Sequence, residues 1–207
     1  MHLPDGIIPI EQSAVYWCIT LIVIAVFLHK FSKNPQKERT MVSIALFSVF
    51  FVVVTSLSIP SPLGVPIHFF LIPLVAIILG PFNGSIVSFF GLLMQALALD
   101  MGGIVCFGAN FLVIGVVVAF VTYGFYTLLD NVNDKLAIFI STVAGIVLAT
   151  FAQILILMVS GAMNLDSLLA TLVPFYLFVG VIEGFANTII IYAIRTIKPE
   201  IMNINKI

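Results

Sequence analysis

The chain has 207 residues, of which 62% are hydrophobic and only 8% are charged, and its mean hydropathy is +1.27. A soluble domain cannot bury that much apolar surface, so the composition excludes a soluble protein and predicts an integral membrane protein. The formal net charge of −1 indicates no particular partner, and we expect the chain to meet the lipid bilayer and no nucleic acid.

Apolar segments follow one another along the whole chain. At about 20 residues for each spanning helix, the length allows roughly six or seven spans and no sizeable soluble domain. The alternating pattern of a membrane barrel is missing, so the spans are predicted to be helical. We expect a single domain over residues 1–207, a compact all-α bundle of about seven transmembrane helices, with an N-terminal helix at about 13–30 and six more over about 41–195. The apolar segments are 13–30, 41–58, 66–80, 83–99, 108–129, 136–160 and 172–195.

The basic residues predict how these helices cross the membrane. If the N-terminus lies outside, all eight Lys and Arg residues fall on the cytoplasmic side, as the positive-inside rule requires. An odd number of spans then puts the C-terminus in the cytoplasm, so we expect a multi-pass protein of a prokaryotic cell membrane. Acidic residues precede the first apolar segment where a signal peptide would be basic, so no cleavable signal peptide is expected. The basic residues are Lys30, Lys33, Lys37, Arg39, Lys135, Arg195, Lys198 and Lys206.

The histidines are the first candidates for chemistry. Of the three in the chain, His2 and His68 fall on the predicted outer side, whereas His29 lies at the inner interface and is expected to bind nothing. The free amine of Met1 and the amide nitrogen of His2 can close a five-membered chelate ring, and that amide with His2 Nδ1 can close a six-membered ring. Three nitrogens then lie in one plane, and His68 is the other imidazole on that side that could supply the fourth. Such a set suits Ni²⁺ or Cu²⁺, suits Co²⁺ less obviously, and does not suit Zn²⁺, Mg²⁺ or Ca²⁺. A lone outer histidine is more often a histidine without a ligand role, so this pattern by itself leaves metal binding open.

Polar residues near the outer ends of the predicted helices add a second signal. Gln95 and Asn110 belong to the fourth and fifth apolar segments, and they should face the bundle interior because unpaired polar groups are costly at membrane depth. Asp5 and Asp100 are expected to be ordinary loop carboxylates. Glu183 stands in the middle of the last segment, where it could be protonated, paired or lining a path, and the sequence does not decide among these.

Four stretches together resemble a known family. "MHLPDG", "IHFFLIPLVAIILGP", "LLMQALALDMGGIVCFGAN" and "GVIEGFANTIIIYAIRTIKPEI" are similar to the substrate-binding subunit of energy-coupling-factor uptake systems for nickel and cobalt, the CbiM/NikM family. The resemblance implies a helical bundle with one more helix than other subunits of its class and an N-terminus inserted into its centre. It implies that Ni²⁺ or Co²⁺, the transported substrate, is bound by the Met1 amine, the amide and imidazole of His2, and His68. The implied partners are a transmembrane coupling subunit, two cytoplasmic ATPase subunits and a small accessory membrane subunit.

Further expectations follow for the residues around the ligands and for the reaction class. Asp5, Gln95, Asp100 and Asn110 are candidates to support the metal ligands, with Asp5 offsetting the charge of the bound ion. The family usually has small residues around the third-segment histidine where this chain has "VPIHFFLIP", while "MHLPDG" looks more like the nickel branch than the cobalt branch. We therefore favour Ni²⁺ over Co²⁺.

Two other functions remain as alternatives to metal uptake. The chain has no G-x-x-x-x-G-K-[ST] loop, so it is predicted to bind no nucleotide and to be no enzyme, with ATP hydrolysed by its partners. One alternative is a binding subunit of the same architecture for another small nutrient. The other is an intramembrane enzyme that uses Glu183 with Cys106 or Asp100, although no His-Glu-x-x-His or Gly-x-Ser-x-Gly pattern supports it.

Overall fold

The computed structural model describes residues 2–60 and 67–203, and this part of the chain is all-helical apart from one isolated bridge between Ile59 and Ile67. Six helices, with α5, η1 and α6 counted as one continuous helix, are long and apolar enough to cross a membrane. The elements are α1 (Ile10–Ser32), α2 (Lys37–Ser56), α3 (Ile72–Leu79), α4 (Pro81–Ala98), α5 (Phe107–Asn110), the π-helix η1 (Phe111–Val117), α6 (Val118–Leu129), α7 (Asp134–Val159), α8 (Leu165–Ile197) and the 3-10 helix η2 (Pro199–Asn203).

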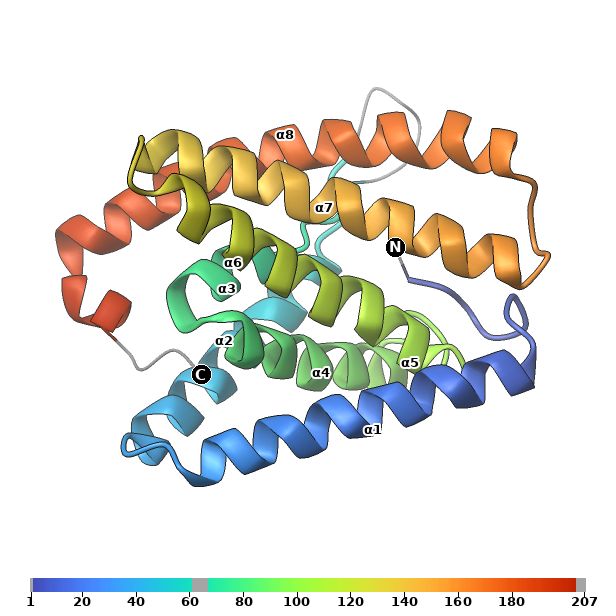
Figure 1. The fold of residues 1–207 in the computed structure, drawn as a ribbon, viewed down its shortest axis with the longest axis horizontal. Helices are drawn as coiled ribbons and strands as arrows, with labels where there is room; N and C mark the ends of the chain where they lie inside the picture. The colour runs from blue at the N-terminus through green and yellow to red at the C-terminus, as the bar shows by residue number, and fades with distance from the viewer. Residues whose placement is uncertain (1, 61–66, 204–207) are drawn as a thin grey trace.

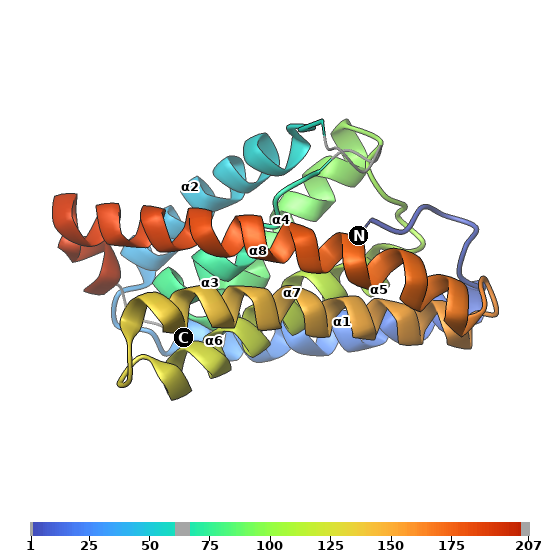
Figure 2. The ribbon, with the colours of Figure 1, turned by 90° about the horizontal axis from the view of Figure 1, so that it is seen from above.

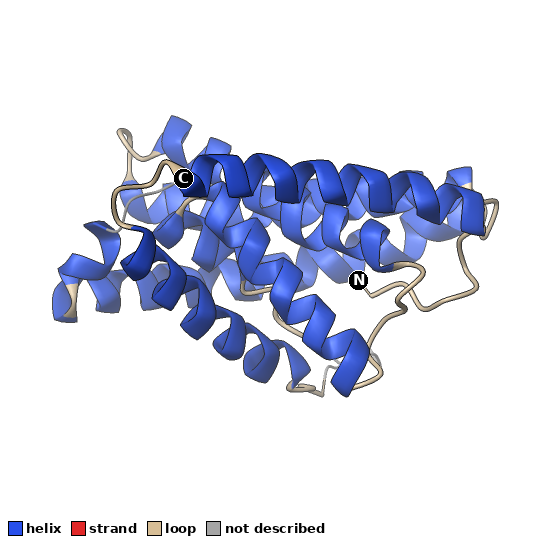
Figure 3. Ribbon diagram, turned by 90° about the horizontal axis from the view of Figure 1, so that it is seen from below, coloured by secondary structure: helices blue, strands red, loops and turns tan. Residues whose placement is uncertain are grey.

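The helices form an elongated bundle with its connections at the two ends (Figure 3). α7 and α8 run antiparallel along one side, and α1 runs along the opposite side (Figure 1). α3, α4 and α6 lie between them, and α2 packs against α4 (Figure 2). This arrangement confirms the predicted all-α membrane bundle.

The third apolar segment, 66–80, predicts a helix of about 15 residues, but the helix that forms there is much shorter. α3 has only eight residues, all of them buried, and it begins after an extended stretch at 67–71. At 1.5 Å per residue such a helix is about 12 Å long, too short to cross a hydrocarbon layer of about 30 Å alone. Leu71 stands before α3 with a φ of 60°, and Gly80, with a φ of 87°, separates α3 from α4. The extended stretch and α3 together therefore make the third passage through the bundle.

The two ends of the bundle differ in their residues. The site end gathers the N-terminal segment 2–9, the loop 99–106 and the turn 160–164; the basic end gathers the turns 33–36 and 130–133 and the tail after α8 (Figures 1 and 2). At the basic end, Lys30 Nζ lies 3.9 Å from the centre of the Phe82 ring. Arg39 donates to the carbonyl of Glu200 at 2.9 Å. The first helix starts at the site end, and the last helix stops at the basic end.

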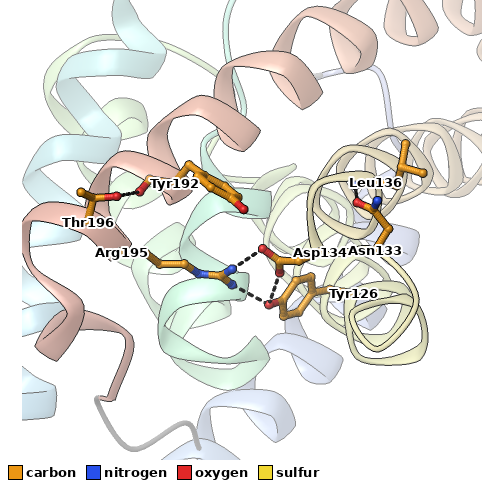
Figure 4. Close-up of polar contacts among 7 residues, drawn as sticks. All are labelled: Tyr126, Asn133, Asp134, Leu136, Tyr192, Arg195 and Thr196. Carbon is orange, nitrogen blue, oxygen red and sulfur yellow. Dashed lines mark hydrogen bonds and ion pairs between the residues drawn. The ribbon is translucent and has the colours of Figure 1, made fainter.

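A ring of polar contacts ties three helices together at the basic end (Figure 4). The Arg195 guanidinium of α8 pairs with the Asp134 carboxylate at the start of α7 and donates to the Tyr126 hydroxyl of α6 at 2.7 Å. Tyr126 in turn donates to Asp134 at 3.2 Å. Because the guanidinium donates from two of its nitrogens to two different side chains, its orientation is fixed, and the ends of α6, α7 and α8 are held together.

Candidate metal centre

The N-terminal segment 2–9 folds back from the start of α1 towards the bundle (Figure 1). The Asn110 side chain holds it there through the backbone of Leu3. The Leu3 N–H donates to Asn110 Oδ1 at 2.7 Å, and Asn110 Nδ2 donates to the Leu3 carbonyl at 3.0 Å. The Leu3 carbonyl also accepts from the Gly103 N–H at 3.2 Å. The buried side-chain amide of Asn110 thus pairs both the N–H and the carbonyl of Leu3. Non-helical backbone inside a membrane bundle requires such partners.

The "MGG" stretch at 101–103 gives the N-terminal segment room to approach. Gly102 has a φ of 82°, and a Cβ there would lie 3.5 Å from His2 Cβ and 3.3 Å from Asn110 Nδ2. A Cβ on Gly103 would overlap the carboxylate of Asp5. That carboxylate accepts from the backbone N–H of Cys106 at 2.9 Å, so Asp5 ties the segment to the loop before α5. Glycine is required at both positions for conformation or space.

His2 is oriented by the side-chain amide of Gln95, and that amide is oriented by the hydroxyl of Thr55. The Thr55 hydroxyl donates to the Phe51 carbonyl at 2.7 Å, so it accepts from Gln95 Nε2 at 2.8 Å. The other end of the amide, Gln95 Oε1, then faces His2 Nε2 at 3.2 Å. Because a carbonyl oxygen can only accept, His2 carries its proton on Nε2 and has a free lone pair on Nδ1.

His68 is oriented by the backbone of the same threonine. Its Nδ1 lies 3.1 Å from the Thr55 carbonyl, which can only accept, so the proton is on Nδ1 and the lone pair is on Nε2. A hydrogen-bonded chain therefore connects the two imidazoles through Gln95 and Thr55. A histidine that binds a metal ion typically donates its other ring N–H to a protein oxygen in this way.

Both histidines line one cavity of about 300 Å³ at the site end of the bundle. Aromatic rings, including those of Phe69 and Phe70, form much of its wall. Burial lowers the pKa of the His2 imidazole from 6.5 to about 4, and the nearby His68 acts in the same direction. The His2 ring is therefore neutral at physiological pH, the form that binds a cation.

The other predicted site residues lie in different places. Met1 and the start of the predicted outer loop, 61–66, lie outside the described residues. Gln95 and Asn110 are buried at the site, as predicted for inward-facing polar groups. Asp100 is exposed and has a left-handed φ of 53°, and His29 lies near the end of α1 at the basic end.

In the part of the chain that the structure describes, no three His, Cys, Asp or Glu side chains lie close enough together to hold a metal ion.

The role of Thr55 was not predicted from the sequence, because a threonine in an apolar helix is common. One of its two contacts to the site, the bond to His68, is also made by its backbone carbonyl and not by its side chain. Its place beside Ser56 at the outer end of the second segment was the available signal.

Glu183 has a partner, which answers the question that the sequence left open. The side chain is 1% exposed, and its carboxylate accepts from the backbone N–H groups of Phe70 and Leu71 at 2.7 and 2.8 Å. These groups belong to the extended stretch that carries His68. Glu183 is thus a structural partner of that stretch in this fold.

Comparisons with known proteins identify the family. The model of the family described as "Cobalt uptake substrate-specific transmembrane region" matches residues 2–201. The chain belongs to the CbiM family. The description of this family is that of a membrane transport component and not of an enzyme, and the six apolar helices agree with a multi-pass membrane protein.

Curated relatives and solved structures agree with membership of the CbiM family. The cobalt transport protein CbiM of Acetohalobium arabaticum is 32% identical over 70% of this chain and 59% of its own length. The putative fused nickel transport protein NikMN of Archaeoglobus fulgidus is 28% identical over 98% of this chain and 68% of its own length. A crystal structure of a transition metal transporter superposes with a TM-score of 0.84 at 25% identity, covering 95% of this chain and 93% of the other. The chain spans about 60% of the length of the CbiM relatives that it matches first.

Proposed function

We propose that this chain is the metal-binding subunit of an ATP-driven importer and that it captures Ni²⁺, or with lower preference Co²⁺, from outside the cell. The observation that carries the proposal is the pairing of the two imidazoles on one cavity. Each has one ring nitrogen engaged by a protein oxygen, which leaves His2 Nδ1 and His68 Nε2 as donors. Nδ1 is also the nitrogen of His2 that can close a six-membered ring with its own amide.

The proposed coordination set has four nitrogens. The amine of Met1, the amide nitrogen of His2 and His2 Nδ1 form two fused chelate rings, and His68 Nε2 completes the plane. One amide anion and three neutral donors leave a divalent ion with about one positive charge, since only the amide contributes a negative charge. Asp5 supports the set by holding the N-terminal segment through the Cys106 N–H.

Two observations favour nickel as the substrate. A planar set of four nitrogens suits Ni²⁺ better than ions that prefer tetrahedral or oxygen-rich sites. The N-terminal motif "MHLPDG", which looks more like the nickel branch of the family than the cobalt branch, points the same way. We infer that the four nitrogens replace the water shell of the ion as it enters the cavity, whose wall is largely aromatic.

The proposed assembly follows from the family resemblance. We propose that residues 1–207 form one metal-binding domain with its N-terminus outside and its C-terminus in the cytoplasm. The site end then faces the metal supply, and the basic end faces the cytoplasm. A transmembrane coupling subunit, two ATPase subunits and a small accessory membrane subunit would supply the energy and the release step.

The N-terminus gives the decisive test. Ni²⁺ binding and the absorption spectrum would be measured on protein with its native terminus and on protein with a ten-residue extension before Met1, whose amine is then an amide. We expect the extension to abolish both high-affinity binding and the planar d–d band. Equal binding by the two proteins would overturn the terminal chelate, and an organic molecule that copurifies without any metal dependence would favour a subunit for another nutrient.

A further inference from the structure

Glu183 stands in the middle of α8, where a carboxylate is costly unless it is paired. Its two oxygens each accept one backbone N–H, Oε2 from Phe70 and Oε1 from Leu71. Bonds of 2.7 and 2.8 Å are in the range of charge-assisted hydrogen bonds to a carboxylate. The carboxylate is therefore committed to the backbone of one short stretch of chain.

That stretch leads directly into α3. The first N–H groups of a helix have no partner within it, and the positive end of the helix dipole attracts an anion. Leu71 is the residue before the first turn of α3, and its φ of 60° turns its N–H towards α8. Glu183 on α8 thus binds the two N–H groups that directly precede α3, and it lies 112 residues beyond Leu71 in the chain.

The same stretch carries His68, and its other side is held by the end of α2. Ile67 exchanges two backbone hydrogen bonds with Ile59, at 3.0 and 2.8 Å, and His68 Nδ1 donates to the Thr55 carbonyl. His68 therefore lies between two anchors, one on the end of α2 and one at Glu183 on α8. A shift at either anchor moves its Nε2 atom.

From this geometry we infer that Glu183 is a positioning residue for metal capture: it holds the 67–71 stretch so that His68 Nε2 meets the plane of the N-terminal chelate. The inference rests on the proposed function, since it concerns the fourth ligand of that site. It also gives α8 a direct mechanical connection to the metal, because movement of α8 relative to α2 would withdraw His68 from the ion.

The test is a double-mutant cycle in the full chain with its native N-terminus. Ni²⁺ affinity and the d–d spectrum would be measured for Glu183→Gln, His68→Ala and the double variant. Glutamine keeps the shape of the side chain but has one acceptor oxygen, so one N–H loses its partner. We expect Glu183→Gln to weaken Ni²⁺ binding about tenfold and to shift the band to longer wavelength as water replaces a nitrogen, and we expect no further effect in the His68→Ala background.

The control is Asn187→Leu, one turn further along α8. Asn187 is also buried, and its side chain donates to the Thr142 hydroxyl of α7 at 3.3 Å, away from the 67–71 stretch. A general loosening of α8 would lower Ni²⁺ affinity in this variant as well, whereas a positioning role leaves its affinity and spectrum unchanged. The unfolding temperature of every variant measures its stability separately, and size-exclusion chromatography of the folded protein checks that it is intact.

The outcomes separate the inference from the function on which it rests. If His68→Ala binds Ni²⁺ like the unaltered chain, the proposed ligand set is overturned. If His68→Ala is weak but Glu183→Gln binds normally, or weakens binding equally with and without His68, the positioning role alone is overturned. Should Glu183→Gln not fold, Glu183→Asp, which keeps the charge but has a shorter reach, replaces it; failure of both to fold would assign Glu183 to stability and overturn the inference.

Discussion

Two non-helical segments carry His2 and His68, the histidines that line the cavity. The backbone groups of these two segments are paired in different ways. The start of the N-terminal segment, residues 2–3, and the stretch 67–71 both lie inside a membrane bundle, where backbone groups without partners are costly. The N-terminal segment is held by a neutral amide, Asn110, which both donates to and accepts from Leu3. The second stretch is held by a carboxyl group, that of Glu183, whose two oxygens accept from two successive N–H groups.

The difference follows from what each segment leaves unpaired. A single residue in extended chain offers one N–H and one C=O in the same plane, and a primary amide complements both. The start of a helix offers only N–H groups, so a carboxylate suits it better. Both holders are buried polar side chains on long helices, and each fixes a ligand segment through the backbone without contacting the imidazole.

The largest effect on Ni²⁺ affinity is expected when the proposed ligands His2 and His68 are themselves replaced. His2→Ala removes a whole chelate ring and His68→Ala removes one donor, so we expect both to lower Ni²⁺ affinity by more than about 100-fold, with His2→Ala the weaker binder. Isothermal titration or competition with a coloured chelator measures this. His29→Ala is the matched control, and a large loss of affinity in that variant would contradict the assignment of the site to the opposite end of the bundle.

A smaller effect is expected when the holder of the N-terminal segment is removed. Asn110→Leu leaves the Leu3 N–H without its partner, so the segment should leave the bundle more often and Ni²⁺ affinity should fall about tenfold. Amide hydrogen exchange at Leu3 should accelerate in the same variant. Unchanged exchange at Leu3 would show that the rest of the segment, including Asp5 and its bond to Cys106, is sufficient to hold it.

The smallest effect sharpens the comparison through pH. Burial lowers the pKa of docked His2 to about 4, so a released His2, with a pKa near 6.5, binds a proton more readily. Docking of the metal-free segment is therefore fully favourable above about pH 6.5 and weakens as the pH falls towards about 4. Nuclear magnetic resonance of histidine-labelled protein should give a midpoint near 4, assigned with His2→Ala, and a midpoint near 6.5 would contradict the docked geometry.

Metal binding should depend on pH over a higher range than His2 itself. An α-amine ordinarily titrates at roughly pH 7.7–8.0, and the chelate also requires loss of an amide proton. We expect Ni²⁺ affinity to fall continuously from about pH 8 to about pH 5, whereas the His2 imidazole stays neutral over most of that range. A flat affinity profile would argue against the amine as a ligand.

The sequence predicted the helices well wherever a hydrophobic run was as long as a membrane is thick. The run 66–80 was predicted to be one helix, but it forms an extended stretch followed by the short helix α3. A buried stretch of this kind is as apolar as a complete span, so hydrophobicity alone does not distinguish the two. The left-handed Leu71 that separates the extended stretch from α3 is not a glycine, so the signal left in the sequence was Pro73 in the first turn of α3, a position typical of a helix start. The π-helical turn at 111–117 left no trace in a run of aliphatic residues.

The candidate site was predictable to the extent that its residues are chemically distinctive. His2 and His68 converge on one cavity, and Gln95 and Asn110 face inward, because imidazoles are few and amides are costly in lipid. Thr55 and the partners of Glu183 were not predictable, because carbonyl and N–H groups are the same at every position. Only the fold determines which backbone groups meet a given side chain.

The position of the two holders along the chain has a consequence for biosynthesis. Leu3 and Asn110 are 107 residues apart, and Phe70 and Glu183 are 113 residues apart, with the holder later in both pairs. A ribosome therefore delivers each histidine segment long before the residue that fixes it, and the second pair is complete only when the last helix enters the membrane. A nascent chain that lacks α8 has both histidines but not the second pair, so on the proposed function only the completed protein should retain the ion.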